Sequence, residues 1–406
     1  MKILMVNKFL YPRGGAETYV FDLAEHLSQN GHEIAYFGMN DSRNSYGNQM
    51  GLGAKNSEFR EFNMRQIFYP FRIIYSFDAR RKMAQVLEYF KPDYVHLNNI
   101  NFQLTPSIVY AIKEKNIPMI QTLHDFQLIC PNHMLYREQD LTVCEKCRAR
   151  KYSECIRYQC IHNSRIKSVM GAFEAWLYYR LKTYDLIDAF IAPSQFLADK
   201  MVDFGENPTK IHTLHNFIKK DFVDRDFNKK NYFLYFGRLS IQKGMGTLLE
   251  AVKQLPDVSF VIAGGGELAE TIAKADLPNL EYVGFQTGEA LLNLIGEARA
   301  TVIPSEWYEN CPMSVLESLT VGTPVIGANI GGIPELIRDG RDGLLFEPAS
   351  VTSLVEAIWS LHDNDDLAED MSKNAREILQ THDIQDYAEK LMEIVTTLTM
   401  KKRGFQ

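Results

Sequence analysis

Residues 302–317 read VIPSEWYENCPMSVLE, and this stretch indicates how the chain folds. The apolar segment Thr301–Pro304 predicts the end of a buried strand, and the apolar spacing after Pro312 predicts a helix. We expect Asn310 to cap this helix and Pro312 to lie in its first turn, where a missing N–H costs nothing. A strand that leads directly into a helix is the repeating unit of an α/β fold.

Two carboxylates, Glu309 and Glu317, lie on either side of the predicted helix start. Glu309 lies in the loop, and Glu317 lies about one and a half turns into the helix, roughly 9 Å further along its axis. Between them, backbone N–H groups and the positive end of the helix dipole suit an anion. This layout fits an activated sugar, with phosphates at the helix end and hydroxyls at the carboxylates. An acidic loop before an ordinary helix is the alternative.

Apolar strand-like segments alternate with helical patterns along the whole chain, which predicts parallel sheets with crossover helices. At 406 residues the chain is also longer than one core comfortably supports. The expected strands of the first half are KILMVN, HEIAYFG, DYVHLN, PMIQTLH, AFIAPS and KIHTLHN, and those of the second half are YFLYFG, SFVIAGG, EYVGF, ATVIP, TPVIGA and GLLFE.

We therefore divide the chain into two Rossmann-like domains. The first spans residues 1–217 and contains a cysteine-rich insertion at 125–165, and a polar linker follows at 218–231. The second domain spans 232–383. The last segment, 384–406, has the pattern of an amphipathic helix and tail that can cross back over either domain. Ligands bind at the carboxyl ends of parallel strands, so two such sheets predict a cleft between the domains.

Composition and charge favour a globular protein over a membrane-spanning or secreted one. Hydrophobic residues make up 46% of the chain and charged residues 23%, as in globular proteins, and no apolar run reaches the roughly 18–20 residues that span a membrane. The opening MKILMVNKFL predicts a first strand rather than a signal peptide. Residues 1–217 carry 26 Lys and Arg against 22 Asp and Glu, whereas the rest carries 18 against 29. We expect a cytoplasmic protein that does not bind nucleic acid.

Glycines and cations follow several of the predicted strands. Gly14 and Gly15 precede a helix at Ala16–Gln29, where their backbone can approach a phosphate, although a plain turn is the alternative. Gly264–Gly266 has the same two interpretations. Neither site completes the G-x-G-x-x-G fingerprint of NAD enzymes. Two D-x-D matches, at 224–226 and 363–365, are interpreted as surface charge rather than as metal sites.

Arg238 and Lys243, in GRLSIQKG, are five residues apart in a loop after a strand, where two cations can hold a diphosphate. A solvated basic loop is the alternative.

His124 ends PMIQTLH, and we expect it to face Glu309 across the predicted cleft. A purely structural histidine is the alternative there.

Together these motifs resemble the family 4 glycosyltransferases, which have the GT-B architecture. The resemblance covers most of the chain and rests on GGAE, GRLSIQKG, VIAGGGEL, the E-x7-E of residues 309–317 and GTPVIGANIGGIPELIRDGRDGLLFEP. It implies metal-independent sugar transfer, with no catalytic metal and with retention of the anomeric configuration.

The same resemblance implies roles for single residues. Glu317 matches the glutamate that holds the ribose of the nucleotide, and Glu309 matches the one near the donor sugar. Arg238 and Lys243 match the diphosphate clamp, His124 the acceptor-domain histidine, and Gly15, with Gly14 beside it, the glycine loop near the phosphates. Many relatives have glycine where this chain has Pro312. Because proline lacks an N–H, we expect the amides of Met313 and Ser314, with the Ser314 hydroxyl, to hold the phosphates.

Five cysteines fall within 31 residues, in the pattern C-x13-C-x2-C-x7-C-x4-C. Thiols in a cytoplasmic protein are usually reduced, and this spacing suits a structural zinc ion. The favoured ligands are Cys144, Cys147, Cys155 and Cys160, with Cys130 as the substitute. His133 and His162 are reserve ligands, and a reduced thiol cluster is the alternative.

Residues 130–182 are basic, with ten Lys and Arg against five Asp and Glu, and contain the aromatic run AFEAWLYYR. This composition suits a lid over a lipid-linked acceptor at the inner face of a membrane, and Gln66–Arg81 can add apolar surface. Helix packing with solvated charge is the alternative.

We expect a retaining hexosyltransferase that uses a UDP- or GDP-linked sugar and extends a glycan, most simply a lipid-linked precursor of a cell-surface polysaccharide. A GT-B sugar-nucleotide epimerase is one alternative, although no further acid/base carboxylates are identified for it. A non-catalytic assembly subunit built on the zinc module is the other.

Overall fold

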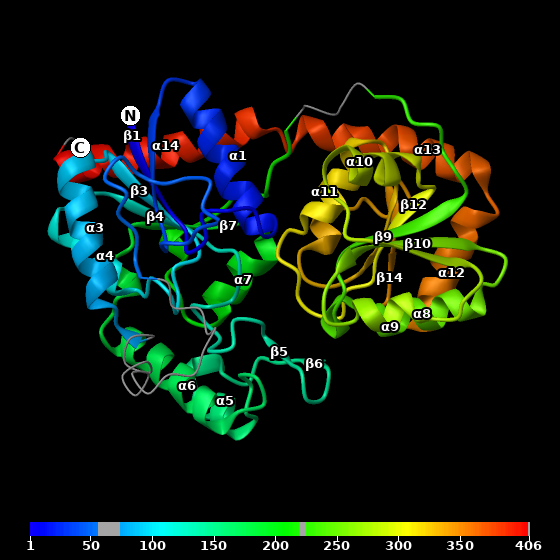
Figure 1. Ribbon diagram of the computed structural model, residues 1–406, viewed down its shortest axis with the longest axis horizontal. Helices are drawn as coiled ribbons and strands as arrows, with labels where there is room; N and C mark the ends of the chain where they lie inside the picture. The colour runs from blue at the N-terminus through cyan, green and yellow to red at the C-terminus, as the bar shows by residue number, and fades with distance from the viewer. Residues whose placement is uncertain (56–73, 220–224, 405–406) are drawn as a thin grey trace. The chain divides into compact units, whose positions relative to one another are not determined.

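The computed structural model describes residues 1–55, 74–219 and 225–404. Contacts divide the chain into two compact units (Figure 1). The first comprises Met1–Met134, Glu145–His215 and Ile384–Gln406, and the second comprises Leu135–Cys144 and Asn216–Asp383. Each unit is built around one six-stranded sheet, so each is described by itself.

The sheet of the first unit has the strand order β2-β1-β3-β4-β7-β8, and all of its neighbouring strands are parallel. Its central strands are buried on both faces, so apolar residues predominate at successive positions, and the buried polar exceptions are His96, Gln121 and Thr122. The strands are β1 (Lys2–Val6), β2 (Glu33–Phe37), β3 (Tyr94–Leu97), β4 (Met119–Thr122), β7 (Ala189–Ala192) and β8 (Ile211–Thr213).

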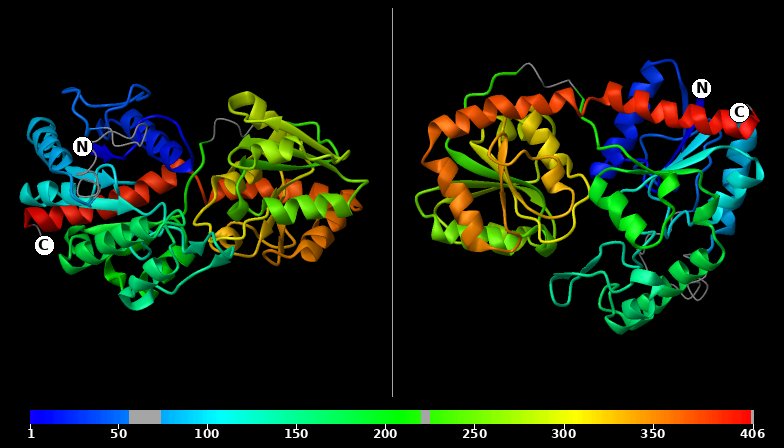
Figure 2. Two further views of the ribbon diagram at one scale, coloured as in Figure 1. Left: turned by 60° about the horizontal axis from the view of Figure 1, so that its bottom comes forward. Right: turned by 180° about the vertical axis from the view of Figure 1, so that it is seen from behind.

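Helices flank this sheet (Figure 2). Three of them begin at a serine, Ser76, Ser164 or Ser194, whose side chain accepts a hydrogen bond from the backbone N–H three residues later. The α-helices are α1 (Gly15–Gln29), α3 (Phe77–Phe90), α4 (Ser107–Glu114), α5 (Ser153–Arg157), α6 (Arg165–Arg180), α7 (Gln195–Asp203) and α14 (Ile384–Arg403), and the 3-10 turns are η2 (Arg148–Arg150), η3 (Tyr184–Leu186) and η4 (Pro208–Lys210).

The C-terminal helix α14 packs in the first unit, although the chain before it lies in the second. The Tyr387 hydroxyl lies 2.6 Å from the Tyr19 hydroxyl on α1, and Lys402 forms an ion pair of 2.7 Å with Asp188. This buried hydrogen bond and this ion pair hold the helix on the first unit.

The sheet of the second unit has the order β11-β10-β9-β12-β13-β14 and is also parallel throughout. Its strands are β9 (Tyr232–Arg238), β10 (Ser259–Gly265), β11 (Leu280–Gly284), β12 (Ala300–Ile303), β13 (Val325–Ala328) and β14 (Gly343–Phe346). The α-helices are α8 (Met245–Gln254), α9 (Ala269–Ala273), α10 (Gly288–Glu297), α11 (Met313–Thr320), α12 (Val351–His362) and α13 (Asp365–Ala375), and the 3-10 turns are η6 (Ile241–Lys243), η7 (Ile333–Glu335) and η8 (Arg376–Gln380).

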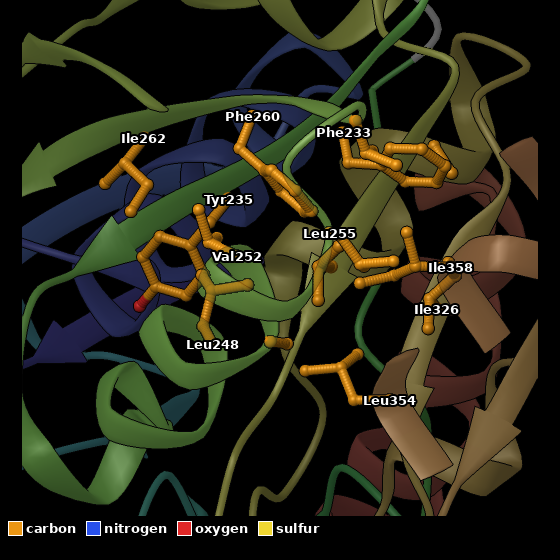
Figure 3. Close-up of a cluster of buried hydrophobic side chains, with 14 of the residues drawn as sticks. Phe233, Tyr235, Leu248, Val252, Leu255, Phe260, Ile262, Ile326, Leu354 and Ile358 are labelled. Carbon is orange, nitrogen blue, oxygen red and sulfur yellow. The ribbon is translucent and has the colours of Figure 1, made fainter. Parts of the chain in front are cut away.

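Strand β9 shows how this core is filled. Phe233 and Tyr235 pack on one face against α8 and α12, in the cluster shown in Figure 3. Leu234 and Phe236 point to the other face and pack against α10. A strand with apolar neighbours on both faces must be apolar at every position, so YFLYF lies at the centre of the sheet.

All twelve predicted strands are present, and no strand was expected at the hairpin β5 (Tyr136–Arg137) and β6 (Thr142–Val143). Two-residue strands are too short to leave a periodic signal in the sequence. The described end of the linker packs on the second unit, because Lys229 and Lys230 bond to Thr323 and Glu297, each at 2.6 Å.

The structure also bears on the two D-x-D matches, on the apolar segment Gln66–Arg81 and on membrane-spanning helices. Asp224 and residues 66–73 lie outside the described residues. Asp226 and Asp365 pair with arginines, at 3.6 Å and 2.8 Å, and Asn364 caps α13. Within the described part of the chain, no helix has the length and apolar composition needed to cross a bilayer.

Candidate active site

Glu309 lies at the centre of a polar cluster in the loop between β12 and α11. Glu309 is 7% exposed, and three donors converge on its Oε1 atom. Lys243 Nζ lies 2.5 Å away, and Ser305 Oγ and Trp307 Nε1 each lie 2.8 Å away. A buried carboxylate needs such partners, because an uncompensated charge in the interior is costly.

The same contacts set the ionisation of Glu309. Burial by itself raises the pKa of this carboxyl, but the charge of Lys243 and the hydrogen bonds from Lys243, Trp307 and Ser305 together lower it below its usual value. The carboxylate is therefore ionised at neutral pH and held in one orientation.

Gly244 explains how Lys243 reaches Glu309 from a loop 66 residues away. Gly244 has a φ of +75°, and a Cβ atom there would lie 1.7 Å from the carbonyl oxygen of Pro304. Only glycine allows the loop after β9 to approach the end of β12 this closely. Lys243 Nζ also lies 5.6 Å from the centre of the Trp307 ring.

Gly331 and Gly332 hold the backbone of Glu309 from the other side. A Cβ atom on Gly331, which has a φ of +63°, would lie 2.3 Å from the Glu309 carbonyl oxygen, and the Gly332 N–H donates to that oxygen at 2.7 Å. These glycines were not predicted from the sequence, and neither were Ser305 and Trp307 as partners of Glu309. The available signals were the glycine pair in NIGGIPE and two donor side chains within four residues of the glutamate.

The predicted cap of α11 is wrong. Pro312, not Asn310, is the N-cap, with an extended backbone (φ −68°, ψ 120°) and no capping side chain. A proline N-cap fits because its fixed φ suits the turn into the helix. Met313 and Ser314 become the first two helical residues, whose N–H groups have no carbonyl four residues earlier within the helix. Glu317 is the fifth residue of α11 and is half-buried.

Arg238 is exposed at the carboxyl end of β9, where it pairs in register with Gly265 of β10. The neighbouring glycines have a packing role. A Cβ atom on Gly264 would lie 1.9 Å from the Gly237 carbonyl oxygen, and one on Gly266 would lie 2.4 Å from that of Leu239. The glycine run therefore allows the ends of β9 and β10 to meet. This close approach places Arg238 at the carboxyl edge of the sheet.

His124 follows β4 in the first unit, and its Nε2 lies 2.9 Å from Asn98 Oδ1. The edge of the Tyr19 ring also packs on it, with 5.1 Å between the ring centres. Burial, with a contribution from the positive charge of Lys8, lowers the pKa of His124 to about 4, although Asp125 acts in the opposite direction. The imidazole is therefore neutral at pH 7, and it offers a hydrogen bond rather than a charge. Asn98, which follows β3, was missed.

Gly14 is the N-cap of α1, with an extended φ of −174°, and Gly15 is its first residue, one position earlier than predicted. Nearby, the buried Glu17 accepts a hydrogen bond of 3.1 Å from Asn7. The helix start carries the N–H groups and dipole of a fifteen-residue helix. A role for this end in binding phosphate stays a prediction.

The cysteines are free thiols. Cys147 and Cys155 pack in one apolar cluster with Cys160 beside them, and Cys144 belongs to the other contact-defined unit. The pKa of the Cys155 thiol is raised, mainly by a hydrogen bond with Cys160 and to a smaller extent by burial. Among the described residues, no group of three or more Cys, His, Asp or Glu is placed to hold a metal ion. The structure thus lends no support to zinc, and the ligand set Cys144, Cys147, Cys155 and Cys160, with Cys130 as substitute, stays an untested prediction.

Solved structures share the GT-B fold. Anabaena HepE in complex with UDP-glucose superposes with a TM-score of 0.70 at 18% identity, covering 98% of this chain and all of that one. Sucrose-phosphate synthase from Thermosynechococcus elongatus gives 0.73 at 16% identity and covers 98% of each chain. These likenesses confirm the fold class of two Rossmann-like domains.

Sequence comparisons agree. An uncharacterized 42.6 kDa protein in the cps region of Klebsiella pneumoniae is 23% identical over 355 residues, which cover 83% of this chain and 88% of that protein. The alpha-D-kanosaminyltransferase of Streptomyces kanamyceticus is 31% identical over 151 residues, 35% of this chain and 39% of that one. These matches do not support the epimerase or the assembly-subunit alternative.

The model of Glycosyl transferases group 1 matches residues 217–378, and that of Glycosyltransferase Family 4 matches residues 13–222. The chain therefore belongs to glycosyltransferase family 4 and is a glycosyltransferase.

Proposed function

We propose that the chain transfers a hexose from a nucleotide donor to a glycan acceptor, with retention of configuration and without a catalytic metal. The Lys243–Glu309 pair carries this proposal. An ionised carboxylate beside a lysine, at the carboxyl ends of two neighbouring strands, supplies one group for sugar hydroxyls and one for phosphate.

The leaving diphosphate gains charge as the glycosidic bond breaks. Arg238, Lys243 and the N-terminus of α11 would stabilise that charge, which removes the need for a divalent ion. Lys243 bonds to Glu309, so a bound diphosphate would compete for this lysine. Glu317 would hold the ribose, and His124 would lie near the donor sugar, with its one ring N–H donated by Nε2 to Asn98.

The identity of the donor can be tested by the slow hydrolysis of nucleotide sugars, a reaction that needs no acceptor. We expect one of UDP-, GDP- and dTDP-linked glucose, galactose and N-acetylglucosamine to be hydrolysed, with UDP-sugars favoured because the HepE structure contains UDP-glucose. EDTA should leave the rate unchanged within about twofold. Product sugar is measured by NMR, which also reports its anomeric configuration. Hydrolysis that depends on added Mg²⁺ or Mn²⁺, or an inverted product, contradicts the proposal.

Helix α6 supports a lipid-linked acceptor. Ile166, Val169, Phe173 and Trp176 follow a helical spacing on one face, and each is at least 44% exposed. The rings of Phe173 and Trp176 stack with centres 5.7 Å apart. Exposed basic residues lie at both ends of this apolar stripe: Arg165, Lys167, Arg180 and Lys182. An apolar face with basic flanks suits the surface of an anionic membrane.

We therefore expect the chain to sediment with vesicles containing 30% phosphatidylglycerol. Because apolar burial supplies much of the binding, Phe173→Ser with Trp176→Ser should weaken it at least tenfold. Phe285 is 75% exposed in the second unit, so Phe285→Ser is the matched control and should bind like the unaltered chain. Equal binding of the double variant and the control would rule out α6 as the contact.

A further inference from the structure

The first unit contains a pocket that shares no residue with the proposed donor site. Its volume is about 350 Å³, within the roughly 300–1,000 Å³ of ligand pockets. It is formed by the loop after β4, the C-terminal half of α6, the turn η3 and the turn after α7. All of these segments belong to the same unit.

Two buried polar side chains line this pocket without satisfying their hydrogen bonds. Glu174 is 5% exposed, and its Oε1 has no hydrogen-bond partner. Gln127 is 7% exposed, and its Nε2 has none. An unpaired polar group in the interior is costly, so two in one pocket call for an explanation. The last side-chain torsion of Glu and Gln is soft, and a small rotation can turn either group toward a ligand.

Four tyrosines form the aromatic part of the wall, and two of them are held in place by their neighbours. Tyr152, Tyr178, Tyr179 and Tyr184 line the pocket. The Tyr178 hydroxyl donates to the Ile74 carbonyl oxygen. Arg150 lies over the Tyr179 ring, 4.8 Å from its centre, and pairs with Glu206. Rigid aromatic faces beside a few polar groups provide both apolar contact and hydrogen bonds.

The polar groups select the class of ligand. The lining carries charges of both signs, Arg150, Arg180 and Lys182 with Asp185 and Glu206, so it selects neither an organic cation nor an anion. The unpaired Glu174 oxygen and the unpaired Gln127 N–H together require a ligand that both donates and accepts hydrogen bonds. A saccharide offers hydroxyls that both donate and accept, and C–H faces that pack on tyrosine rings.

We propose that this pocket binds a saccharide unit, with hydroxyls on Glu174 and Gln127 and a sugar face against the tyrosines. Burial raises the pKa of Glu174 to about 8, so at pH 7 its carboxyl is protonated and can also donate a hydrogen bond. The site goes beyond the proposed transfer reaction, because it is a second place on the chain at which a glycan is held.

Saturation-transfer NMR on the full chain, without nucleotide, tests this inference. The probes are glucose, galactose, N-acetylglucosamine and their β-linked disaccharides, with tetramethylammonium as the cationic comparison. We expect at least one saccharide to bind. Glu174→Leu and Gln127→Leu should each weaken binding at least tenfold, whereas Glu174→Gln should stay within about threefold. Binding to the unaltered chain should fall above about pH 8, and binding to Glu174→Gln should not.

Glu393, exposed on α14, provides the control variant Glu393→Leu, which should bind normally. Circular dichroism of each variant separates misfolding from loss of the site, and Glu174→Gln keeps the shape of the side chain. The inference is overturned if no saccharide binds, if both leucine variants bind unchanged, or if only tetramethylammonium binds. Because no donor is present, this result is independent of donor hydrolysis.

Discussion

Replacing Glu309 with alanine or glutamine should reduce sugar transfer at least 100-fold while nucleotide binding stays within a few-fold. The loss is large because Glu309 is the carboxylate that Lys243, Ser305 and Trp307 fix in one orientation. Removing a preorganised polar group from a reacting centre typically costs about 10²–10³ in rate. Glutamine is the sharper change, since it keeps the shape and removes only the charge.

Transfer or donor hydrolysis gives the rate, and calorimetry with the nucleotide diphosphate gives the affinity. Glu306 provides a control in the same loop, because it accepts a hydrogen bond of 2.6 Å from Thr247 and makes no described contact with Lys243. Glu306→Gln should keep its rate within about threefold. Unchanged turnover in Glu309→Gln would remove Glu309 from the reaction, and loss of nucleotide binding would place it with the nucleotide instead of the sugar.

Replacing Glu174 with glutamine should stabilise the first unit by about 3 kcal/mol at pH 7. Burial raises the pKa of this carboxyl from 4.5 to about 8. The unfolded chain ionises it above pH 4.5, whereas the folded chain keeps it protonated until about pH 8. Stability is therefore lost as pH rises through this window, and the loss approaches about 5 kcal/mol above it. Glutamine cannot ionise and avoids the loss.

Denaturant unfolding of the full chain at pH 5, 7 and 8.5 measures this effect. The advantage of Glu174→Gln should be small at pH 5, grow with pH and level off above pH 8. The exposed Glu393→Gln is the control and should show no such trend. An advantage that does not change with pH would mean that Glu174 is ionised in the folded chain, paired with a cation.

Local signals in the sequence predicted the strands but not every helix end. Segments such as YFLYFG and SFVIAGG are apolar throughout because both faces of their strands are covered, and this property is visible in a short window. The start of α11 was misplaced because asparagine is the better capping residue in general. Here Pro312, with its fixed φ, begins the helix two residues later than Asn310 would.

The sequence by itself determined the α/β class, the twelve strands of the two sheets, the family motifs and the residues proposed to bind the donor. Only the tertiary structure decided that Lys243 pairs with Glu309, that Gly244 and Gly331 allow this contact, and that Glu174 and Gln127 share one pocket. The physical reason is that strands and helices follow from neighbouring residues, whereas these contacts depend on sheet order and loop packing between residues far apart in the chain.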